Sequence, residues 1–304
     1  MPARTLGFAL AVALNATFGD PPNVAHPVAW FGRLAGRVES TVPASSAHRG
    51  GAGLASTVAL ASLAAAVAEL ASRQGRGSPV VEGALLWLAF SRRSLFVRGI
   101  EVADALDTGD LAEARRLLAY HLVSRDTGDL DVSEVAGAAI ESIAENLSDS
   151  VVAPWCWYAV GGAWSAWGYR ALNTLDAMWG YRTPRYLDFG RAAARADDLV
   201  NLMPSRIAAL AIVAAARAGK GDAASAWRIW RRDARLTSSP NAGHPMSAMA
   251  GALGVQLTKR GEYRLGGDGR APRADDLRRA VAIARAASWG VAAALALTMM
   301  RRTR

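Results

Sequence analysis

The sequence is poor in cysteine and lysine, and this scarcity excludes several classes of protein. Its one cysteine, Cys156, rules out a disulfide framework and a metal site built from several cysteines. Lysine occurs only at Lys220 and Lys259, so arginine supplies nearly all of the positive charge behind the net +9. The arginines are scattered and accompany no zinc-finger, helix-turn-helix or RNA-binding motif, so we expect no nucleic-acid partner. The sequence also lacks a Walker A loop, a dinucleotide fingerprint, an HExxH motif and a nucleophile elbow.

Two long segments, residues 50–68 and 150–169, contain no charged residue. Each is long enough to cross a hydrocarbon core of about 30 Å, so each is a candidate membrane span. Several shorter runs also lack charged residues. Asn15 interrupts the first of them, at residues 5–19, and no small-residue cleavage pattern follows, so we interpret that run as a retained membrane helix. These shorter runs fit short spans, re-entrant segments or buried helices, and they occupy residues 5–19, 83–91, 207–216 and 286–300.

Alanine, leucine and glycine dominate the sequence, and apolar residues recur at helical spacing. This pattern predicts an all-α, polytopic helical membrane protein with helical soluble loops. We expect residues 1–304 to form a single integral membrane domain, with a helical soluble insertion at 91–148 and a polar loop and helix region at 219–279. Within the insertion, Gly109 should break a helix and Asp110 should cap the next one.

Glycine also predicts a local feature of the second long apolar segment. Gly161 and Gly162 lie in the middle of residues 150–169, where they would permit a re-entrant hairpin. By contrast, residues 275–300 contain no such break. They are predicted to form one helix whose second half enters the membrane.

The first polar stretch that adjoins an apolar run covers residues 19–30. Two prolines and the His26-Pro27 pair force an extended backbone there. His26 is a candidate catalytic general base. A capping or structural role is an equally good interpretation of this histidine.

The second polar stretch carries Glu141, Glu145 and Asp149, which recur every four residues and so share one helix face. No Lys or Arg lies three or four residues away to pair with them, and clustered carboxylates repel one another unless a cation joins them. We therefore predict that the three hold Mg²⁺, with Glu145 and Asp149 also catalytic and the intervening Asn146 and Ser148 binding substrate. A solvated helix face is the alternative.

Two further polar stretches are predicted to bind substrate. Residues 173–201 alternate acidic side chains with arginines, and internal salt bridges are the alternative explanation. Residues 236–246 could hold an anion through backbone amides, although the composition also fits a simple turn. The predicted substrate-binding residues are Asn173, Asp176, Arg195, Asp197, Asp198 and Asn201 in the first stretch, and Ser239, Asn241 and Gly243 in the second.

Together these stretches resemble, in order and spacing, the adenosylcobinamide-phosphate synthase family of cobalamin biosynthesis. Two departures concern Met246, where the family often has an acidic residue, and residues 146–150, which lack one hydroxyl of the family pattern. The likeness extends over nearly the whole chain. The motifs that carry it are GDP at 19–21, HPV at 26–28, RDT at 125–127, ESIAENLSD at 141–149, VAP at 152–154, NTLDAM at 173–178, YLDFG at 186–190, ARADDLVN at 194–201, PSR at 204–206, SPNAG at 239–243 and MAGALGV at 249–255.

The resemblance implies an ATP-dependent amide ligation. A propionate of adenosylcobyric acid, a corrinoid, would be activated and then attacked by the amine of (R)-1-aminopropan-2-ol or of its O-phosphate. ATP and Mg²⁺ would be the cofactors, and Mg²⁺ and arginine would offset charge on the transferred phosphoryl group. The implied partners are the two substrates, the lipid bilayer and other enzymes of cobalamin assembly. The implied location is the inner cell membrane, crossed several times, with the active-site loops in the cytoplasm.

Two alternatives remain open at this point. A transporter or scaffold for corrinoid intermediates would fit the low charge of the apolar segments, but its polar residues would be expected at broken helices near the bilayer midplane. A soluble helical protein with very apolar core helices is the other alternative. Purification without detergent would support it.

Overall fold

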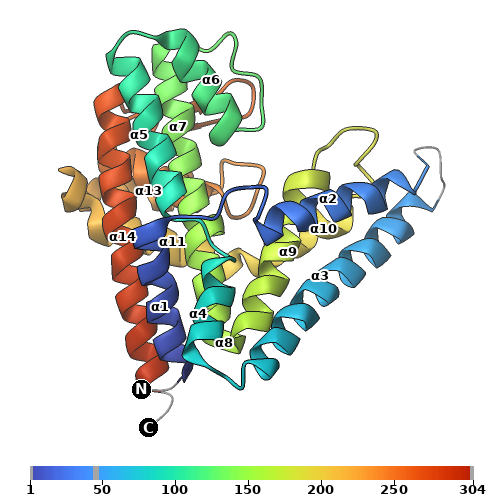
Figure 1. The fold of residues 1–304 in the computed structure, drawn as a ribbon. Helices are drawn as coiled ribbons and strands as arrows, with labels where there is room; N and C mark the ends of the chain where they lie inside the picture. The colour runs from blue at the N-terminus through green and yellow to red at the C-terminus, as the bar shows by residue number, and fades with distance from the viewer. Residues whose placement is uncertain (1–2, 44–47, 302–304) are drawn as a thin grey trace. The chain divides into compact units, whose positions relative to one another are not determined.

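The computed structural model describes residues 3–43 and 48–301, and the chain forms two compact units. Unit 1 comprises residues 1–91, 153–201 and 294–304, and unit 2 comprises residues 92–152 and 202–293. Nearly all described elements are helices (Figure 1), so the all-α class is confirmed. Almost all of residues 91–148 and all of 219–279, which the sequence distinguished from the apolar segments, fall in unit 2.

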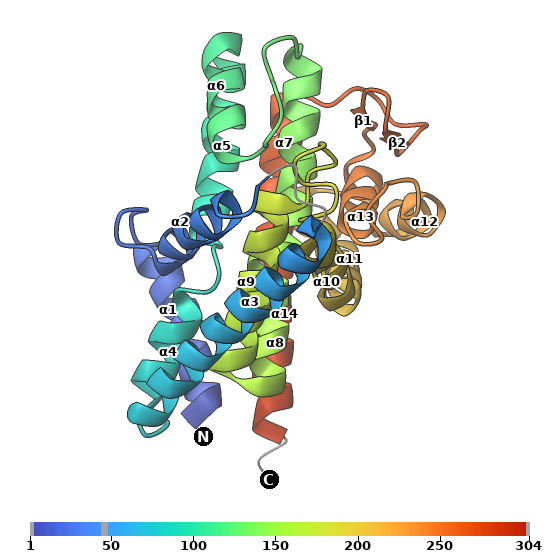
Figure 2. The ribbon, with the colours of Figure 1, turned by 90° about the vertical axis from the view of Figure 1, so that its right-hand side faces the viewer.

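Seven helices make up most of unit 1. The helix α1 packs along α4, while α3 packs against α9 and α10 (Figure 2). Glycine allows the first contact, because a Cβ on Gly7 would come within 2.7 Å of the Glu82 Cβ. The elements are α1 (Ala3–Phe18), α2 (Pro27–Ser40), α3 (Arg49–Gln74), α4 (Pro79–Trp87), α8 (Ala153–Gly161), α9 (Ala163–Trp179) and α10 (Arg191–Val200).

A buried ion-pair network fastens the loop before α10 to the rest of unit 1. Glu39 of α2 accepts a hydrogen bond from Arg49 of α3 at 2.9 Å and is paired with Arg185 of the loop. The Arg49 guanidinium also lies 5.1 Å from the ring centre of Phe189. The loop backbone comes so close to α3 that a Cβ on Gly53 would lie 2.0 Å from the Phe189 carbonyl oxygen, so only glycine fits there.

The sequence allows two forms for residues 150–169, one continuous span or a hairpin at Gly161 and Gly162. The structure excludes the continuous span. The chain turns at Gly162, which has φ +87°, and α8 and α9 then pack against each other. The predicted hairpin at Gly161 and Gly162 is therefore what the structure shows. Since a positive φ is disfavoured for residues with a Cβ, glycine is needed at position 162.

Unit 2 contains a helical hairpin, an α-helix that continues into a π-helix, and three helices that pack together. Gly109 has φ +78° and the Asp110 side chain accepts a hydrogen bond from the Glu113 amide, so the predicted helix break and cap are confirmed. A short antiparallel hairpin was not expected from the sequence. The elements are α5 (Arg93–Asp107), α6 (Leu111–His121), α7 (Val132–Asn146), the π-helix η1 (Leu147–Val152), α11 (Leu202–Ala215), the 3-10 helix η2 (Ala216–Gly219), α12 (Ala223–Asp233), α13 (Gly243–Leu253), β1 (Leu257–Lys259), β2 (Tyr263–Leu265) and α14 (Ala274–Arg301). The last residues of α14, from 294 on, belong to unit 1.

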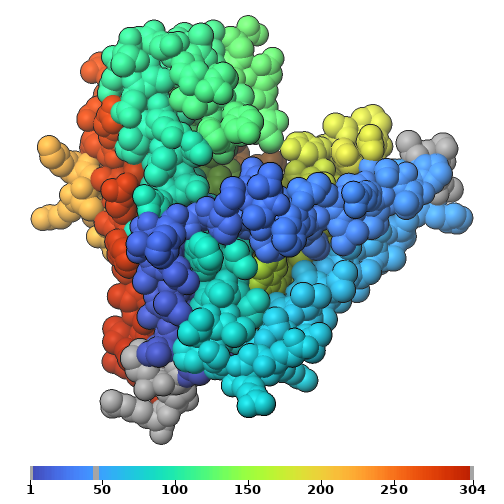
Figure 3. All heavy atoms as spheres, in the orientation of Figure 1, coloured from blue at the N-terminus to red at the C-terminus, as the bar shows by residue number. Residues whose placement is uncertain are grey.

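Three helical segments in the described part of the chain are long and apolar enough to cross a membrane: Arg49–Gln74, Leu202–Gly219 and Ala274–Arg301. The first covers the candidate span at residues 50–68, and the third confirms that residues 275–300 form one helix. Much of the outer side of α3 lies on the surface of unit 1 (Figure 3), and Leu54, Val58, Leu63 and Val67 are exposed along it. An exposed apolar face of this kind is suited to lipid, so the protein is an all-α membrane protein.

Candidate functional site

Unit 1 brings together five of the predicted substrate-binding residues, from α9 and α10. The Asp197 carboxylate accepts hydrogen bonds from the Asn173 amide at 3.2 Å and from the Asn201 amide at 3.0 Å. The Asn201 side chain in turn accepts a hydrogen bond from the Tyr169 hydroxyl at 3.0 Å. We call the group the α9–α10 cluster, and it consists of Asn173, Asp176, Asp197, Asp198 and Asn201.

Two carboxylates of the α9–α10 cluster, those of Asp176 and Asp197, have pKa values above that of a free aspartate. Burial, and next the charge of Asp198, raise the pKa of Asp176 to about 6. Burial also raises the pKa of Asp197, and the neighbouring Asp176 adds to the effect while the two asparagine amides oppose it. These acidic groups can therefore exchange a proton close to neutral pH.

Salt bridges explain only part of the stretch from 173 to 201. Arg191 pairs with Asp188 at 2.6 Å, both being exposed, and Arg185 pairs with the distant Glu39. Asp197 is held by asparagine amides instead. Arg195 lies exposed on α10, on the same helix as Asp197.

His26 caps the first turn of α2. Its Nδ1 accepts a hydrogen bond from the Val28 amide at 3.2 Å, and burial followed by the charge of Arg170 lowers its pKa. A neutral imidazole that accepts at Nδ1 carries its proton on Nε2. It then has no lone pair left to take a proton, so the geometry favours the capping interpretation of His26 over the general base.

The loop of residues 239–243 in unit 2 is bound to the start of α11. The Arg206 guanidinium donates to Oδ1 of Asn241 at 2.9 Å and to the Pro240 carbonyl at 3.2 Å, and the Ser205 hydroxyl donates to the same Asn241 oxygen. Two predicted motifs, residues 204–206 and 239–243, thus form one structure. The acceptors that Arg206 contacts are neutral, so its positive charge can still attract an anion.

The loop side chains have distinct roles. The Ser239 hydroxyl accepts hydrogen bonds from the Asn241 and Ala242 amides, which closes the turn. A Cβ on Gly243 would lie 2.2 Å from the Ala234 carbonyl oxygen, so glycine is required there for packing. Ser239 therefore shapes the loop and Gly243 permits its approach to α12.

His244 follows the loop and stays neutral. Its Nδ1 accepts a hydrogen bond from the Trp230 indole at 2.9 Å. Burial, followed by the charges of Arg206 and Arg235, lowers its pKa to about 4. The two arginines therefore supply the positive charge beside the loop at neutral pH, and His244 supplies none.

Glu141 of α7 is buried and has a partner that the local sequence did not reveal. The Arg125 guanidinium lies 3.5 Å from one carboxylate oxygen, while Oε1 is buried without a hydrogen bond among the described residues. Burial raises the pKa of Glu141 to about 7, with Arg125 opposing the shift and Glu145 adding to it. The absence of basic residues three or four positions away thus did not mean that the carboxylate lacks a cation.

Glu145 and Asp149 are half-buried, as is Asn146, whereas the Ser148 hydroxyl is buried without a hydrogen bond among the described residues. Asp149 lies in the π-helix η1, just before Pro154, which cannot donate a backbone hydrogen bond. Within residues 3–43 and 48–301, no three His, Cys, Asp or Glu side chains form a group that could hold a metal ion. Glu141, Glu145 and Asp149 therefore do not form the three-carboxylate metal site that their spacing suggested.

The two motif regions of unit 2 pack on one another through their helices. The helix α13 follows the 239–243 loop and packs against α7, while α11 packs against η1. Sequence reasoning gave no individual role to Arg206, Arg125 or Arg170, although Arg206 and Arg125 stand in quoted motifs. Arg170 donates to the Asn173 side chain at 3.3 Å and precedes its motif by three residues.

Comparisons with known proteins agree with this arrangement of motifs. The family model described as CobD/Cbib protein matches residues 8–289. A cobalamin biosynthesis protein CobD of Mycobacterium tuberculosis is 41% identical over 98% of this chain and 97% of its own length. Proteins of the same name from Geobacter metallireducens and Chromobacterium violaceum are 43% and 42% identical, over 81% and 92% of this chain and 79% and 92% of their own lengths. No solved structure matches.

The match spans both units and includes every motif that carries the resemblance to the adenosylcobinamide-phosphate synthases. Identity of about 40% over nearly the full length is far above what a shared fold alone would need. The chain belongs to the CobD/Cbib family of cobalamin biosynthesis proteins.

Proposed function

We propose that the protein joins (R)-1-aminopropan-2-ol, or its O-phosphate, to a propionate of adenosylcobyric acid in an ATP-dependent amide ligation. A carboxylate oxygen of the corrinoid attacks the γ-phosphorus of ATP, and the bond to ADP breaks. The amine nitrogen then attacks the acyl carbon and phosphate leaves. The ammonium form of the amine loses one proton before the attack, and the nitrogen loses a second as the amide forms.

The observation that carries this proposal is the geometry of the α9–α10 cluster, in which the Asn173 and Asn201 amides hold the Asp197 carboxylate next to other carboxylates. Burial, which raises the pKa of Asp176 to about 6, supports it. Aliphatic ammonium groups need both a counter-charge to bind and a base to accept their proton. The cluster offers carboxylates for the first and, in Asp176, a group with a proton affinity suited to the second near neutral pH. We assign amine binding to this cluster, with Asn173 and Asn201 orienting Asp197.

The 239–243 loop is suited to the anionic part of the reaction. Arg206 and Arg235 provide positive charge, and the Asn241 side chain is fixed by Arg206 and Ser205. Charge-assisted hydrogen bonds from arginine are well suited to phosphate oxygens. We assign this loop to a phosphate of ATP or to the activated carboxylate.

Glu145 and Asp149 remain the proposed contacts for Mg²⁺. Magnesium at phosphate sites is commonly held by one or two carboxylates with the phosphates and water, so a three-carboxylate group is not required. The half-buried positions of the two side chains and the buried Ser148 hydroxyl fit such a donor set. When bound, the ion would neutralise charge on the transferred phosphoryl group.

The test is a reconstituted assay of the purified protein with adenosylcobyric acid, ATP, Mg²⁺ and each amine. On this proposal, ADP release requires both the corrinoid and an amine, and Asp176→Asn lowers the rate by at least about 100-fold, the usual loss when a catalytic base is removed. Asp188→Asn, at an exposed ion pair, should leave the rate within a factor of two. Corrinoid uptake into vesicles without ADP release would instead support the transporter alternative.

A further inference from the structure

Unit 1 contains a cavity of about 630 Å³ whose lining includes no residue of the α9–α10 cluster. It lies where α1 begins and α3 ends, whereas the other end of α1 leads to His26. The 16 residues of α1 rise by about 24 Å, so the cavity and His26 lie at opposite ends of this helix. We call it the Glu82 cavity, and its polar lining residues are Arg4, Thr5, Glu69, Ser72, Arg73, Arg76 and Glu82.

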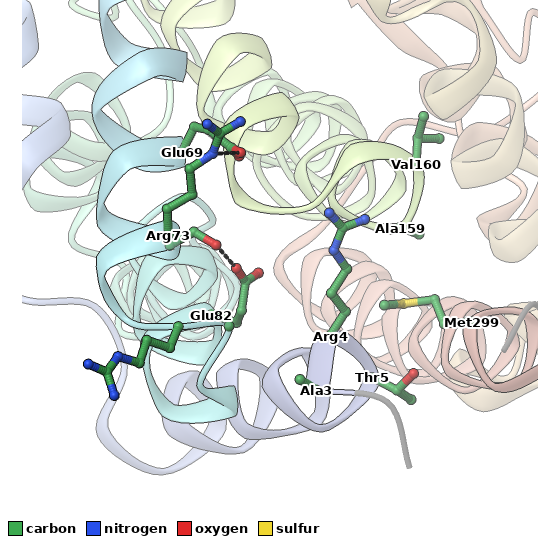
Figure 4. Close-up of a pocket in the computed structure, with 12 residues that line it drawn as sticks. Ala3, Arg4, Thr5, Glu69, Arg73, Glu82, Ala159, Val160 and Met299 are labelled. Atoms are coloured by element: carbon green, nitrogen blue, oxygen red, sulfur yellow. Dashed lines mark hydrogen bonds and ion pairs between the residues drawn. The ribbon is translucent and has the colours of Figure 1, made fainter.

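Glu82 is the most unusual group in this cavity. It is only 3% exposed, and its Oε1 accepts a hydrogen bond from the Ser72 hydroxyl. Its Oε2 accepts no hydrogen bond of normal geometry among the described residues, although the Tyr158 hydroxyl lies near the carboxylate and interacts with it. Figure 4 shows the Glu82 carboxylate directed toward the space between Arg73 and Arg4. A buried carboxylate oxygen without a donor is costly, so a ligand that brings N–H groups would satisfy it.

Three arginines, Arg4, Arg73 and Arg76, line the Glu82 cavity. Arg73 pairs with Glu69 at 2.7 Å, but its side chain is 76% exposed and remains accessible to a ligand. Arg76 has φ +51°, a left-handed conformation that is strained for arginine and natural for glycine. Retention of a charged side chain at a strained position is a reason to look for a use of that charge.

The cavity lies at the depth expected for phospholipid headgroups. The uncharged part of α3 ends at Ala68, and Glu69 and Arg73 follow in its last turns. Charged residues that close an apolar span mark the boundary between hydrocarbon and headgroups. On the apolar side of this boundary, α3 exposes Leu54, Val58, Leu63 and Val67, which offer a surface for acyl chains.

We propose that the Glu82 cavity binds the headgroup of a membrane phospholipid that carries a primary amine, as phosphatidylethanolamine does. The phosphate contacts Arg4 and Arg76, and the ammonium donates hydrogen bonds to Oε2 of Glu82. Phosphatidylcholine lacks N–H donors and phosphatidylglycerol lacks the cation, so both satisfy Glu82 poorly. The site does not depend on the proposed ligation, and it gives the protein a preference for a class of lipid.

Thermal unfolding of the delipidated, detergent-solubilised full chain tests this proposal. Phosphatidylethanolamine should raise the unfolding temperature by several degrees more than phosphatidylcholine or phosphatidylglycerol. Glu82→Gln keeps the size and the Ser72 contact but removes the charge, so it should abolish the difference between the three lipids. Arg33→Gln, at an exposed arginine of α2, should behave as the native protein does.

A second variant separates ligand binding from folding. Arg76→Gly relieves the positive φ, so it should raise the unfolding temperature without lipid and reduce the shift that phosphatidylethanolamine causes. Equal shifts with phosphatidylethanolamine and phosphatidylcholine, or an unchanged preference in Glu82→Gln, would overturn the proposal. An equal shift with water-soluble glycerophosphoethanolamine would overturn a lipid as the source of the headgroup.

Discussion

The Arg206 guanidinium donates a hydrogen bond to Oδ1 of Asn241 at 2.9 Å, across 35 residues of sequence. This contact joins the start of α11 to the loop that precedes α13, and it orients Asn241. All the acceptors that Arg206 contacts are neutral, so no carboxylate among them offsets its positive charge. A neutral His244 beside it keeps the local charge independent of pH above about 5, since its pKa is lowered to about 4.

Arg206→Gln should weaken ATP binding. The change removes a charged donor to a phosphate, worth about 1.5–3 kcal/mol, so the KM for ATP should rise roughly 10- to 100-fold. Steady-state kinetics of ADP release measure it. Arg228→Gln, at an exposed arginine of α12, should leave the KM unchanged. An equal rise in both variants would show that only the general positive charge of unit 2 matters.

Asp176→Asn should stabilise the fold at alkaline pH while it removes activity. Burial raises the folded-state pKa from 3.8 to about 6, so the folded protein binds the proton more tightly than the unfolded chain does. Stability from this group is therefore present below pH 4 and is lost as pH rises to about 6. The asparagine variant avoids that loss, which amounts to about 1–3 kcal/mol at pH 8.

Thermal unfolding at pH 8 and pH 4 checks this prediction for Asp176. The difference between variant and native protein should be large at pH 8 and small at pH 4. A destabilised Asp176→Asn at pH 8 would mean that the charged form is held by a cation, which contradicts the proton-accepting role.

Glu145→Gln and Asp149→Asn should each lower turnover by about 100-fold or more at limiting Mg²⁺. Their unfolding temperatures should change little or rise, because the changes relieve repulsion between like charges. Glu141→Gln serves as the comparison, since Glu141 is buried beside Arg125 and is not expected to contact the ion. Near-normal rates in both Glu145→Gln and Asp149→Asn would reject the metal role.

The motif loops should face the cytoplasm, where ATP and corrinoid intermediates are found. Single cysteines at positions 146 and 241 in a Cys156→Ser background should react with membrane-permeant reagents only. Cys156 is the single cysteine of the sequence, so its replacement by serine removes any background labelling. Labelling of both positions from the periplasmic side would contradict this orientation.

Local chemistry made some elements predictable and left others hidden. Gly109 and Asp110 define a helix break and cap by themselves, and the glycine pair at 161–162 ends a helix without help from the rest of the fold. The pairing of Glu141 with Arg125 joins residues 16 apart through the fold, so no helical spacing rule could find it.

The hairpin of β1 and β2 and the π-helix were also missed. Each strand has only three residues, too few for an alternating pattern to be seen. The π-helix lies just before Pro154, and helical periodicity alone does not reveal such a widening. The α9–α10 cluster was anticipated as a list of residues, but the bonding of Asp197 to asparagines instead of arginines required the structure.

The most direct test of the proposed ligation follows oxygen from the corrinoid carboxylate. Adenosylcobyric acid labelled with ¹⁸O in that carboxylate is incubated with the purified protein, ATP, Mg²⁺ and the amine, and the products are analysed by mass spectrometry. Activation by phosphorylation predicts an amide product and one ¹⁸O atom in each inorganic phosphate released. An amide without label in phosphate, or no amide from either amine, would contradict the account.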